Sequence, residues 1–560
     1  MKKARRIAAM IAAMAMAAMM AVSAMSFSAG ALTKNTVTIV GEQATSSAKK
    51  HSYKAYKIFD GTVDEGQLKN ITFAGSDFNE FLTALKSDAK LGNDFDTVTD
   101  VAGVAAKLAN YSNDSTETKA FAQFVAEHTN LIAAAVESAT TEGNQNTIPL
   151  TTDGYYVIIE VVPAETQTDF AMTSYILAQY DASEGADINA KSTVPSVDKQ
   201  VQDEETDAEA GATDGWGETA DHAINESFKF KLTATLEADA NYGAYKTYKI
   251  QFNDTLSAGV TYDDIVSVKV NGTTINSYDK DPNGYQLTEP TVTAPALGGG
   301  NLTITIADIK KFDADLTDGA TIEVIYNAHL NANAAVETED KDSVGTDYDN
   351  VNKVNLEYSN NPNAGGAGDT GKTPEDYVWV FTYSVENVKK KDSETGENLA
   401  GAKFKLYTTK TAGTPDTYSG EIKLINNEDG TYTVANQTAT TDDFDELVSA
   451  DSTGKFDIKG LDAGTYYLVE TEAPSGYKLA EPIEIVIGAT HKEKDTTGTA
   501  AQVTMEASQN MSNTIIDESG STLPSTGGIG TLMFVLCGGV AAGIAGVYLV
   551  SKKKTREEEV

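Results

Sequence analysis

The sequence predicts a mainly β protein of tandem β-sandwiches, with helices added to the first domain. β-branched and alternating runs, such as 228–236 and 321–326, recur between turn residues through the middle and last parts of the chain. Apolar residues at three- and four-residue steps occur early, at 78–86 and 118–126, and predict helices there. Small, turn-forming residues at 181–195, and again ahead of the last part of the chain, separate the sandwiches.

These breaks divide the chain into domains of ordinary size. We predict an N-terminal leader, a helix-containing first domain, a middle sandwich, a C-terminal sandwich and a terminal tail. In that order, their predicted limits are 1–31, 32–190, 194–365, 375–517 and 523–560.

An internal echo relates the first and third domains. Segments 154–160 and 464–470 each place a glutamate, Glu160 or Glu470, six residues after a glycine at the end of an aromatic strand. The echo predicts a shared β-core, and the alternative is coincidence between two apolar strands.

The leader has the layout of a secretory signal peptide. Lysines and arginines among the first six residues precede an apolar Ala/Met run, which ends in small residues at 28–31. The alternative, a retained membrane anchor, is disfavoured because polar sequence follows the small residues. We therefore predict that residues 1–31 are removed on secretion.

The tail combines a short motif with an apolar stretch and a basic end. LPSTG at 523–527 precedes the uncharged stretch 529–550 and the basic residues of 552–556. At about 1.5 Å rise per residue, such a stretch just crosses a hydrocarbon core of about 30 Å. The basic residues favour the cytoplasmic side. The chain is therefore predicted to leave the cell N-terminus first and to pause with its C-terminus in the membrane.

Charge and composition exclude several classes of function. The formal net charge of −39 argues against nucleic-acid partners, because binding polyphosphate requires clustered Lys and Arg. The single cysteine, Cys537, lies in the apolar tail, so no disulfide is available. The histidines are too scattered to show a metal-ligand spacing. We predict no metal and no cofactor.

The order of motif, apolar span and basic end in the tail resembles the cell-wall sorting signal of Gram-positive surface proteins. The resemblance implies that a sortase cysteine attacks the Thr526 carbonyl, releases Gly527 onward and passes the acyl group to an amine. Pro524 favours an extended, kinked substrate. An ordinary membrane anchor behind a chance pentapeptide is the alternative. The implied recognition residues are Leu523, Pro524, Ser525, Thr526 and Gly527.

Residues 466–477 match the pilin E-box, Tyr-x-Leu-x-Glu-Thr-x-Ala-Pro-x-Gly-Tyr, at every fixed position. Together with the opening pattern at 388–404, they resemble the collagen-adhesin-type B domain, an immunoglobulin-like sandwich. The resemblance implies an isopeptide bond from Lys390 to Asn513, or alternatively to Asn510, with Glu470 as the catalytic acid. The alternative is a surface lysine and an ordinary strand-end carboxylate.

Isopeptide formation requires a buried lysine beside a carboxyl group. Burial disfavours both charged forms, so it lowers the pKa of a lysine and raises that of a carboxyl group. The neutral acid can polarise the amide carbonyl and move protons as ammonia leaves. Proximity in a folded domain supplies about 7–11 kcal/mol of the barrier. The reaction occurs once per domain, so we predict no enzymatic turnover.

The middle domain resembles the companion collagen-adhesin-type A domain through 194–201, 248–262 and 354–362. This resemblance implies a bond from Lys199 to Asn360, with Asp254 as the acid. Asn361 is the alternative acceptor, and the alternative for Asp254 is that it merely starts a turn.

Polymerisation needs an accessible amine on the next subunit. In pilins this lysine lies in the linker after the first domain, within a Tyr-Pro-Lys-Asn phrase. Here 187–193 replaces that phrase, and Lys191 occupies the corresponding place. We predict Lys191 as the linking lysine, with a solvated linker lysine as the alternative.

These resemblances imply a sortase-assembled major pilin, the shaft subunit of a covalent, wall-anchored pilus on the cell surface. The implied partners are a pilin-class sortase, a housekeeping sortase, identical subunits, minor tip and basal pilins, and peptidoglycan. A host or extracellular-matrix ligand is a further candidate. The alternatives are a monomeric wall-anchored adhesin and a tip or minor pilin, which need Thr526 but not Lys191.

Overall fold

The computed structural model describes most of the chain between residues 35 and 520. The described residues are 35–40, 51–113, 115–140, 146–162, 168–189, 193–204, 208, 212–293, 296–313, 316–364, 369–438, 444–493, 498–506 and 509–520. The predicted leader 1–31, the sorting motif 523–527 with its tail, and Lys191 lie outside these residues. Of the helices in the described part, none is long and apolar enough to cross a membrane.

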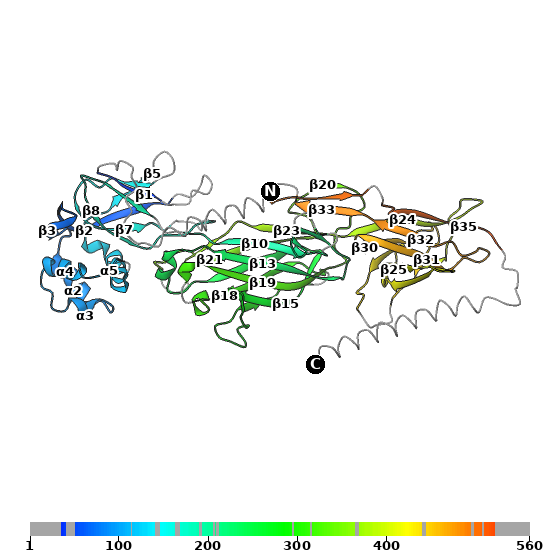
Figure 1. The fold of residues 1–560 in the computed structure, drawn as a ribbon, viewed down its shortest axis with the longest axis horizontal. Helices are drawn as coiled ribbons and strands as arrows, with labels where there is room; N and C mark the ends of the chain where they lie inside the picture. Colours follow the sequence, from blue (N-terminus) through cyan, green and yellow to red (C-terminus); the bar gives the residue numbers. More distant parts are fainter. Residues whose placement is uncertain are drawn as a thin grey trace.

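Three bodies follow one another along the long axis of the molecule (Figure 1). The first, in blue, carries the α-helices of the described residues, whereas the green middle body and the yellow-to-red third body consist mainly of strands. This architecture confirms the predicted mainly β class of tandem domains with helices added to the first.

The first domain packs its helices against a five-stranded sheet. The Asp77 side chain caps α2 by accepting hydrogen bonds from the N–H groups of Asn79 and Glu80, and Ser115 caps α5. Phe81 and Phe124 contact across the helical layer, with ring centroids 5.5 Å apart. The two sheets have the strand orders β3-β2-β7-β8, with β4 beside β2, and β5-β6-β1-β9. The elements are β1 (Val37–Val40), β2 (Tyr53–Asp64), β3 (Gln67–Phe73), α2 (Phe78–Ser87), α3 (Gly92–Phe95), α4 (Val101–Leu108), α5 (Thr116–Glu127), η1 (Thr129–Leu131), β4 (Val136–Glu137), β5 (Ala139–Thr140), β6 (Asn146–Ile148), β7 (Gly154–Glu160), β8 (Ile176–Tyr180) and β9 (Ala186–Asn189).

The middle domain is a sandwich of two large sheets. Its long central strands alternate fully buried residues with more exposed ones, so one face of each strand enters a common core. The strand orders are β11-β10-β13-β19-β15-β16 and β12-β23-β21-β14-β18-β17, with β22 beside β21. The elements are β10 (Ser196–Gln202), β11 (Trp216–Gly217), β12 (Thr219–Asp221), β13 (Ser227–Leu236), η2 (Ala240–Ala244), β14 (Ile250–Leu256), β15 (Val260–Val270), β16 (Thr273–Thr274), β17 (Gln286–Thr288), β18 (Gly300–Ile306), η3 (Ile309–Lys311), η4 (Leu316–Asp318), β19 (Ala320–Leu330), β21 (Val351–Ser359), β22 (Thr370–Lys372) and β23 (Asp376–Phe381).

The third domain is a smaller sandwich with a three-stranded sheet at its inner end. Its sheets have the orders β27-β28-β30-β24-β35, β26-β25-β31-β32 with β29 beside β25, and β20-β34-β33. Strand β35 runs parallel to its neighbour β24. The elements are β20 (Lys341–Val344), β24 (Tyr383–Asp392), β25 (Lys403–Thr411), β26 (Thr417–Glu421), β27 (Leu424–Asn426), β28 (Thr431–Val434), β29 (Leu447–Val448), β30 (Asp457–Leu461), β31 (Gly464–Glu472), β32 (Ile483–Ile487), β33 (Ala489–Glu493), β34 (Ala501–Met505) and β35 (Ser512–Asp517).

The middle and third domains exchange strands across the boundary predicted at 365–375. β23, expected in the third domain, pairs with β21 and β12 of the middle domain. β20, expected in the middle domain, pairs with β34 of the third. The two sandwiches are therefore interlocked by hydrogen-bonded strands.

Candidate functional site

A lysine is buried in the core of the middle domain. Lys199 on β10 is fully buried, and its Nζ lies 2.8 and 2.9 Å from the two carboxylate oxygens of Asp254 on β14. Nζ also lies 4.9 Å from the centre of the Phe230 ring. Since β10 and β14 belong to opposite sheets, the pair crosses the interior of the sandwich. The structure thus brings together two of the three residues predicted for this domain.

Burial shifts the proton equilibrium of this pair toward its neutral form. Burial lowers the pKa of Lys199, although the charge of Asp254 opposes the shift. Burial likewise raises the pKa of Asp254, against the opposing effect of Lys199. Proton transfer from the ammonium to the carboxylate produces the free amine that acyl chemistry requires.

Asn352, and not the predicted Asn360, lies at this pair. Asn352 on β21 is fully buried, and its Nδ2 donates to the Tyr326 hydroxyl at 2.5 Å. Tyr326 in turn donates to Asp254 Oδ2 at 2.6 Å and accepts from Lys199 Nζ at 3.3 Å. The Asn352 side-chain amide is therefore linked to Lys199 and Asp254 through the Tyr326 hydroxyl.

Asn360 lies beyond the other end of β21, about 26 Å along a strand from Asn352. Its carbonyl accepts from the N–H of Met172 at 2.7 Å, and its own N–H donates to Asp369 O at 3.0 Å. The alternative, Asn361, donates to the Asp369 carboxylate at 2.8 Å. The structure therefore brings neither the predicted acceptor Asn360 nor its alternative Asn361 to Lys199.

The third domain buries a second lysine. Lys390 on β24 is fully buried, and its Nζ lies 3.0 Å from Glu470 Oε1 on β31 of the facing sheet. Nζ also forms an ion pair with Asp517 at the end of β35, the strand next to β24. All three side chains are closed to solvent. The predicted lysine and glutamate therefore meet in the core.

Asp517, and not Asn513, places its side-chain carboxyl group beside Lys390. Along β35 the inward-facing positions include Ile515 and Asp517, and Ile515 lies opposite Lys390 in the parallel register. Asn513 donates instead to the carbonyl of Asn510 at 2.7 Å. Asn510 donates to the Glu484 carbonyl on β32 at 2.6 Å. Neither predicted asparagine reaches the lysine, because the register places the end of β35 there.

Glu470 has the surroundings of a catalytic acid. Burial raises its pKa, against the opposing effects of a hydrogen bond from the Ala480 N–H at 2.6 Å and of Lys390. A carboxyl group that holds its proton can polarise a neighbouring carbonyl. Its two oxygens have separate partners, since Oε2 faces the backbone and Oε1 faces Lys390.

Asp392 and Tyr477, which belong to the two sequence motifs of this domain, also contact each other. Asp392, just after Lys390, accepts a hydrogen bond from the Tyr477 hydroxyl at 2.7 Å. The Thr395 N–H also donates to the Asp392 carboxylate at 2.6 Å, and these bonds lower its pKa to about 2. The contact fastens the loop after β24 to the loop that follows the E-box strand.

Residues 385–501 match the family model described as the SpaA prealbumin-like fold domain. The matched residues include Lys390 and Glu470, and the match ends before β35. A search of curated proteins finds no match.

Solved pilin structures resemble the chain over most of its length. The T6 backbone pilin of Streptococcus pyogenes serotype M6 is 17% identical, covers 88% of this chain and 100% of its own, and gives a TM-score of 0.49. The full-length major pilin SpaD of Corynebacterium diphtheriae is 15% identical, covering 87% and 98%, with a TM-score of 0.42. BcpA, the major pilin subunit of Bacillus cereus, is 14% identical, covering 87% and 100%, with a TM-score of 0.39.

The first domain repeats one feature of the prealbumin-like domain. Glu160 is buried at the end of β7, as Glu470 is on β31. Its Oε2 accepts from the Thr173 N–H at 2.7 Å, and its Oε1 lies 2.5 Å from His51 Nδ1. An imidazole therefore faces this glutamate, where an amine faces Glu470.

Sequence reasoning missed Asn352, Tyr326 and Asp517. Asn352 alternates with the buried apolar residues Val354 and Leu356 along β21, and Asp517 follows the buried Ile515 on the same face of β35. A polar residue in such an alternation was the available signal. Tyr326 had no comparable signal, because a tyrosine suits a buried strand position whether or not its hydroxyl has a function.

Proposed function

We propose that the protein is the structural shaft subunit of a covalently polymerised, wall-anchored pilus on the cell surface. The observation that carries the proposal is the pair of buried lysine–acid–acyl clusters, one in each of two tandem sandwiches. The match of residues 385–501 to the SpaA domain supports it, as do the secretion and sorting motifs at the chain ends. The proposed role is mechanical, and each internal reaction occurs once.

In the middle domain, Lys199 and Asn352 condense into an isopeptide bond with loss of ammonia. Lys199 transfers a proton to Asp254, and the free amine attacks the Asn352 carbonyl carbon. The Tyr326 hydroxyl lies between Asp254 and the amide nitrogen, so it relays the proton that the departing ammonia needs. The attacking nitrogen then loses its extra proton to Asp254, so Asp254 ends protonated, ammonia leaves, and one amide replaces another.

In the third domain, Lys390 and Asp517 condense with loss of water. The Lys390 amine attacks the side-chain carboxyl carbon of Asp517, and Glu470 passes a proton from the attacking nitrogen to the departing hydroxyl, which leaves as water. The product is the same amide that an asparagine at 517 would give.

Both bonds join an early strand to a late strand of the same domain. Lys199 on β10 and Asn352 on β21 belong to opposite sheets, whereas Lys390 on β24 and Asp517 on β35 are neighbours in one sheet. Tension entering near the predicted linking lysine, Lys191, and leaving through Thr526 would cross each sandwich by a covalent route. Hydrogen-bond ladders would then carry little of the force, which is what a shaft requires.

The decisive experiment follows polymerisation on the producing cell. Lys191→Ala and Thr526→Ala should each abolish the high-mass ladder seen on denaturing gels of wall extracts, and Lys191→Ala should leave wall-linked monomer. Lys199→Arg is the matched control, because it alters a buried lysine and should leave the ladder in place. Wild-type protein found only as wall-linked monomer would favour the adhesin alternative. A ladder that persists in Lys191→Ala would assign the linkage to another lysine.

A further inference from the structure

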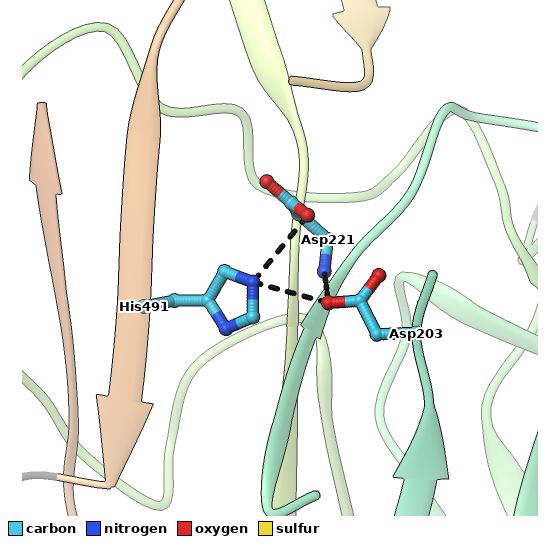
Figure 2. Close-up of side chains that lie close together, drawn as sticks. All are labelled: Asp203, Asp221 and His491. Carbon is cyan, nitrogen blue, oxygen red and sulfur yellow. Dashed lines mark hydrogen bonds and ion pairs between the residues drawn. The ribbon is translucent and has the colours of Figure 1, made fainter. Parts of the chain in front are cut away.

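A buried cluster of two carboxylates and one imidazole lies where the middle and third domains meet (Figure 2). Asp203 follows β10 and Asp221 ends β12, both in the middle domain, whereas His491 lies on β33 of the third. Each of the three side chains is only 1% exposed. The cluster is thus assembled from two domains and closed to solvent.

The three donor atoms are spaced as ligands of one cation. His491 Nε2 lies 3.1 Å from Asp203 Oδ2 and 3.4 Å from Asp221 Oδ1. In a tetrahedral site with bonds of about 2.0–2.2 Å, neighbouring ligand atoms lie about 3.3–3.6 Å apart. Small adjustments would therefore admit a metal ion among these atoms.

One carboxylate oxygen of the cluster, Asp221 Oδ2, is buried and makes no hydrogen bond among the described residues. The other oxygen of Asp221, Oδ1, faces His491 Nε2 across 3.4 Å. Because buried polar atoms are normally paired, the remaining oxygen points to a ligand held at the cluster.

The partners of these side chains orient them for metal binding. His491 Nδ1 lies 2.8 Å from Thr219 Oγ1. When Nδ1–H donates to that hydroxyl, the lone pair of Nε2 faces the two carboxylates, as in many metal-bound histidines. The N–H of Asp221 donates to Asp203 Oδ2 at 3.3 Å and holds the two carboxylates together.

We propose that Asp203, Asp221 and His491 bind one zinc ion, which joins the middle domain to the third. One imidazole nitrogen and two carboxylate oxygens are ligands that zinc accepts, and a water would complete the four-coordinate site. Calcium is disfavoured because it takes six to eight oxygen ligands. Zinc held here would fasten the joint between the two sandwiches without cysteine.

Zinc retention by the full chain tests this proposal. The chain, purified in detergent and stripped with a chelator, is dialysed against Zn²⁺ or Ca²⁺, and bound metal is counted by mass spectrometry. We expect one zinc and no calcium per chain. His491→Gln and Asp221→Asn should each weaken zinc binding by more than about 100-fold, and Thr219→Val by about 10–100-fold. His329→Gln is the matched control, because His329 pairs with Asp263 at 2.8 Å away from the cluster.

Zinc X-ray absorption of the loaded wild type gives a readout that does not depend on variants. It should show one imidazole and oxygen neighbours at about 2.0–2.2 Å. The competing account is a metal-free ion pair: burial lowers the pKa of His491, but hydrogen bonds to Asp203 and Asp221 outweigh burial and raise it to about 10. A wild type that retains no zinc overturns our proposal in favour of that ion pair. Retention unchanged in His491→Gln, or a spectrum without imidazole, also overturns it.

Discussion

Asn352→Ala and Asn360→Ala form a matched pair that tests the acceptor in the middle domain. The two bonds proposed for the wild type remove one ammonia and one water, about 35 Da in total, once folding has brought the groups together. Asn352→Ala should lie only about 18 Da below the mass calculated from its sequence, because only the third domain can react. Asn360→Ala should keep the full deficit, because Asn360 lies at the junction with the first domain.

A variant that lacks the mass deficit of the middle domain should also have a lower thermal stability. The bond from Lys199 to Asn352 closes a loop of about 150 residues, and by loop-closure entropy it stabilises the domain by about 5 kcal/mol. For a domain of this size, its loss should lower the unfolding midpoint by about 10–20 °C. Calorimetry of each variant, paired with intact-mass analysis, measures both effects. A full mass deficit in Asn352→Ala together with a reduced one in Asn360→Ala would refute the assignment made from the geometry.

Four further substitutions test the remaining details. Asp517→Asn should still form the bond to Lys390, and its mass should equal that of the bonded wild type. Glu470→Gln should not form this bond, so intact-mass analysis should show a chain that has not lost the water. Tyr326→Phe should slow bond formation in the middle domain, so newly made protein should show a mixture of bonded and unbonded masses that matures with time. The pKa of Asp392 is lowered to about 2, chiefly by the N–H of Thr395 and then by the Tyr477 hydroxyl. The ionised carboxylate therefore stabilises the folded state fully above its ordinary pKa of about 4, and this stabilisation is lost as the pH falls toward 2. Asp392→Asn should therefore flatten the dependence of the free energy of unfolding on pH between about 4 and 2, as acid titration would measure.

The fold class and the two buried lysines were predictable because they depend on local patterns. Alternation identified the long strands, three- and four-residue steps identified α2 and α5, and fixed motif spacings identified Lys390 and Glu470. The helix α4 was missed, since its short Ala/Gly-rich sequence shows little periodicity.

The acceptors proposed here were not predictable because their positions depend on register. A choice between Asn352 and Asn360 requires knowing which end of β21 faces Lys199, and a choice between Asn513 and Asp517 requires the parallel pairing of β24 with β35. The cluster of His491 with Asp203 was also beyond sequence reasoning. Its members come from two domains and meet only after both have folded.

The strand exchange between the last two sandwiches limits how they can be recombined in evolution. A gene fusion cut near residue 375 would transfer β23–β35 but leave behind β20, the strand that completes the β20-β34-β33 sheet. It would also remove β23 from β12 and β21, the strands of the middle domain with which it pairs. Successful exchange of the C-terminal module should therefore carry its upstream partner strand with it, so the inherited unit is longer than the visible domain.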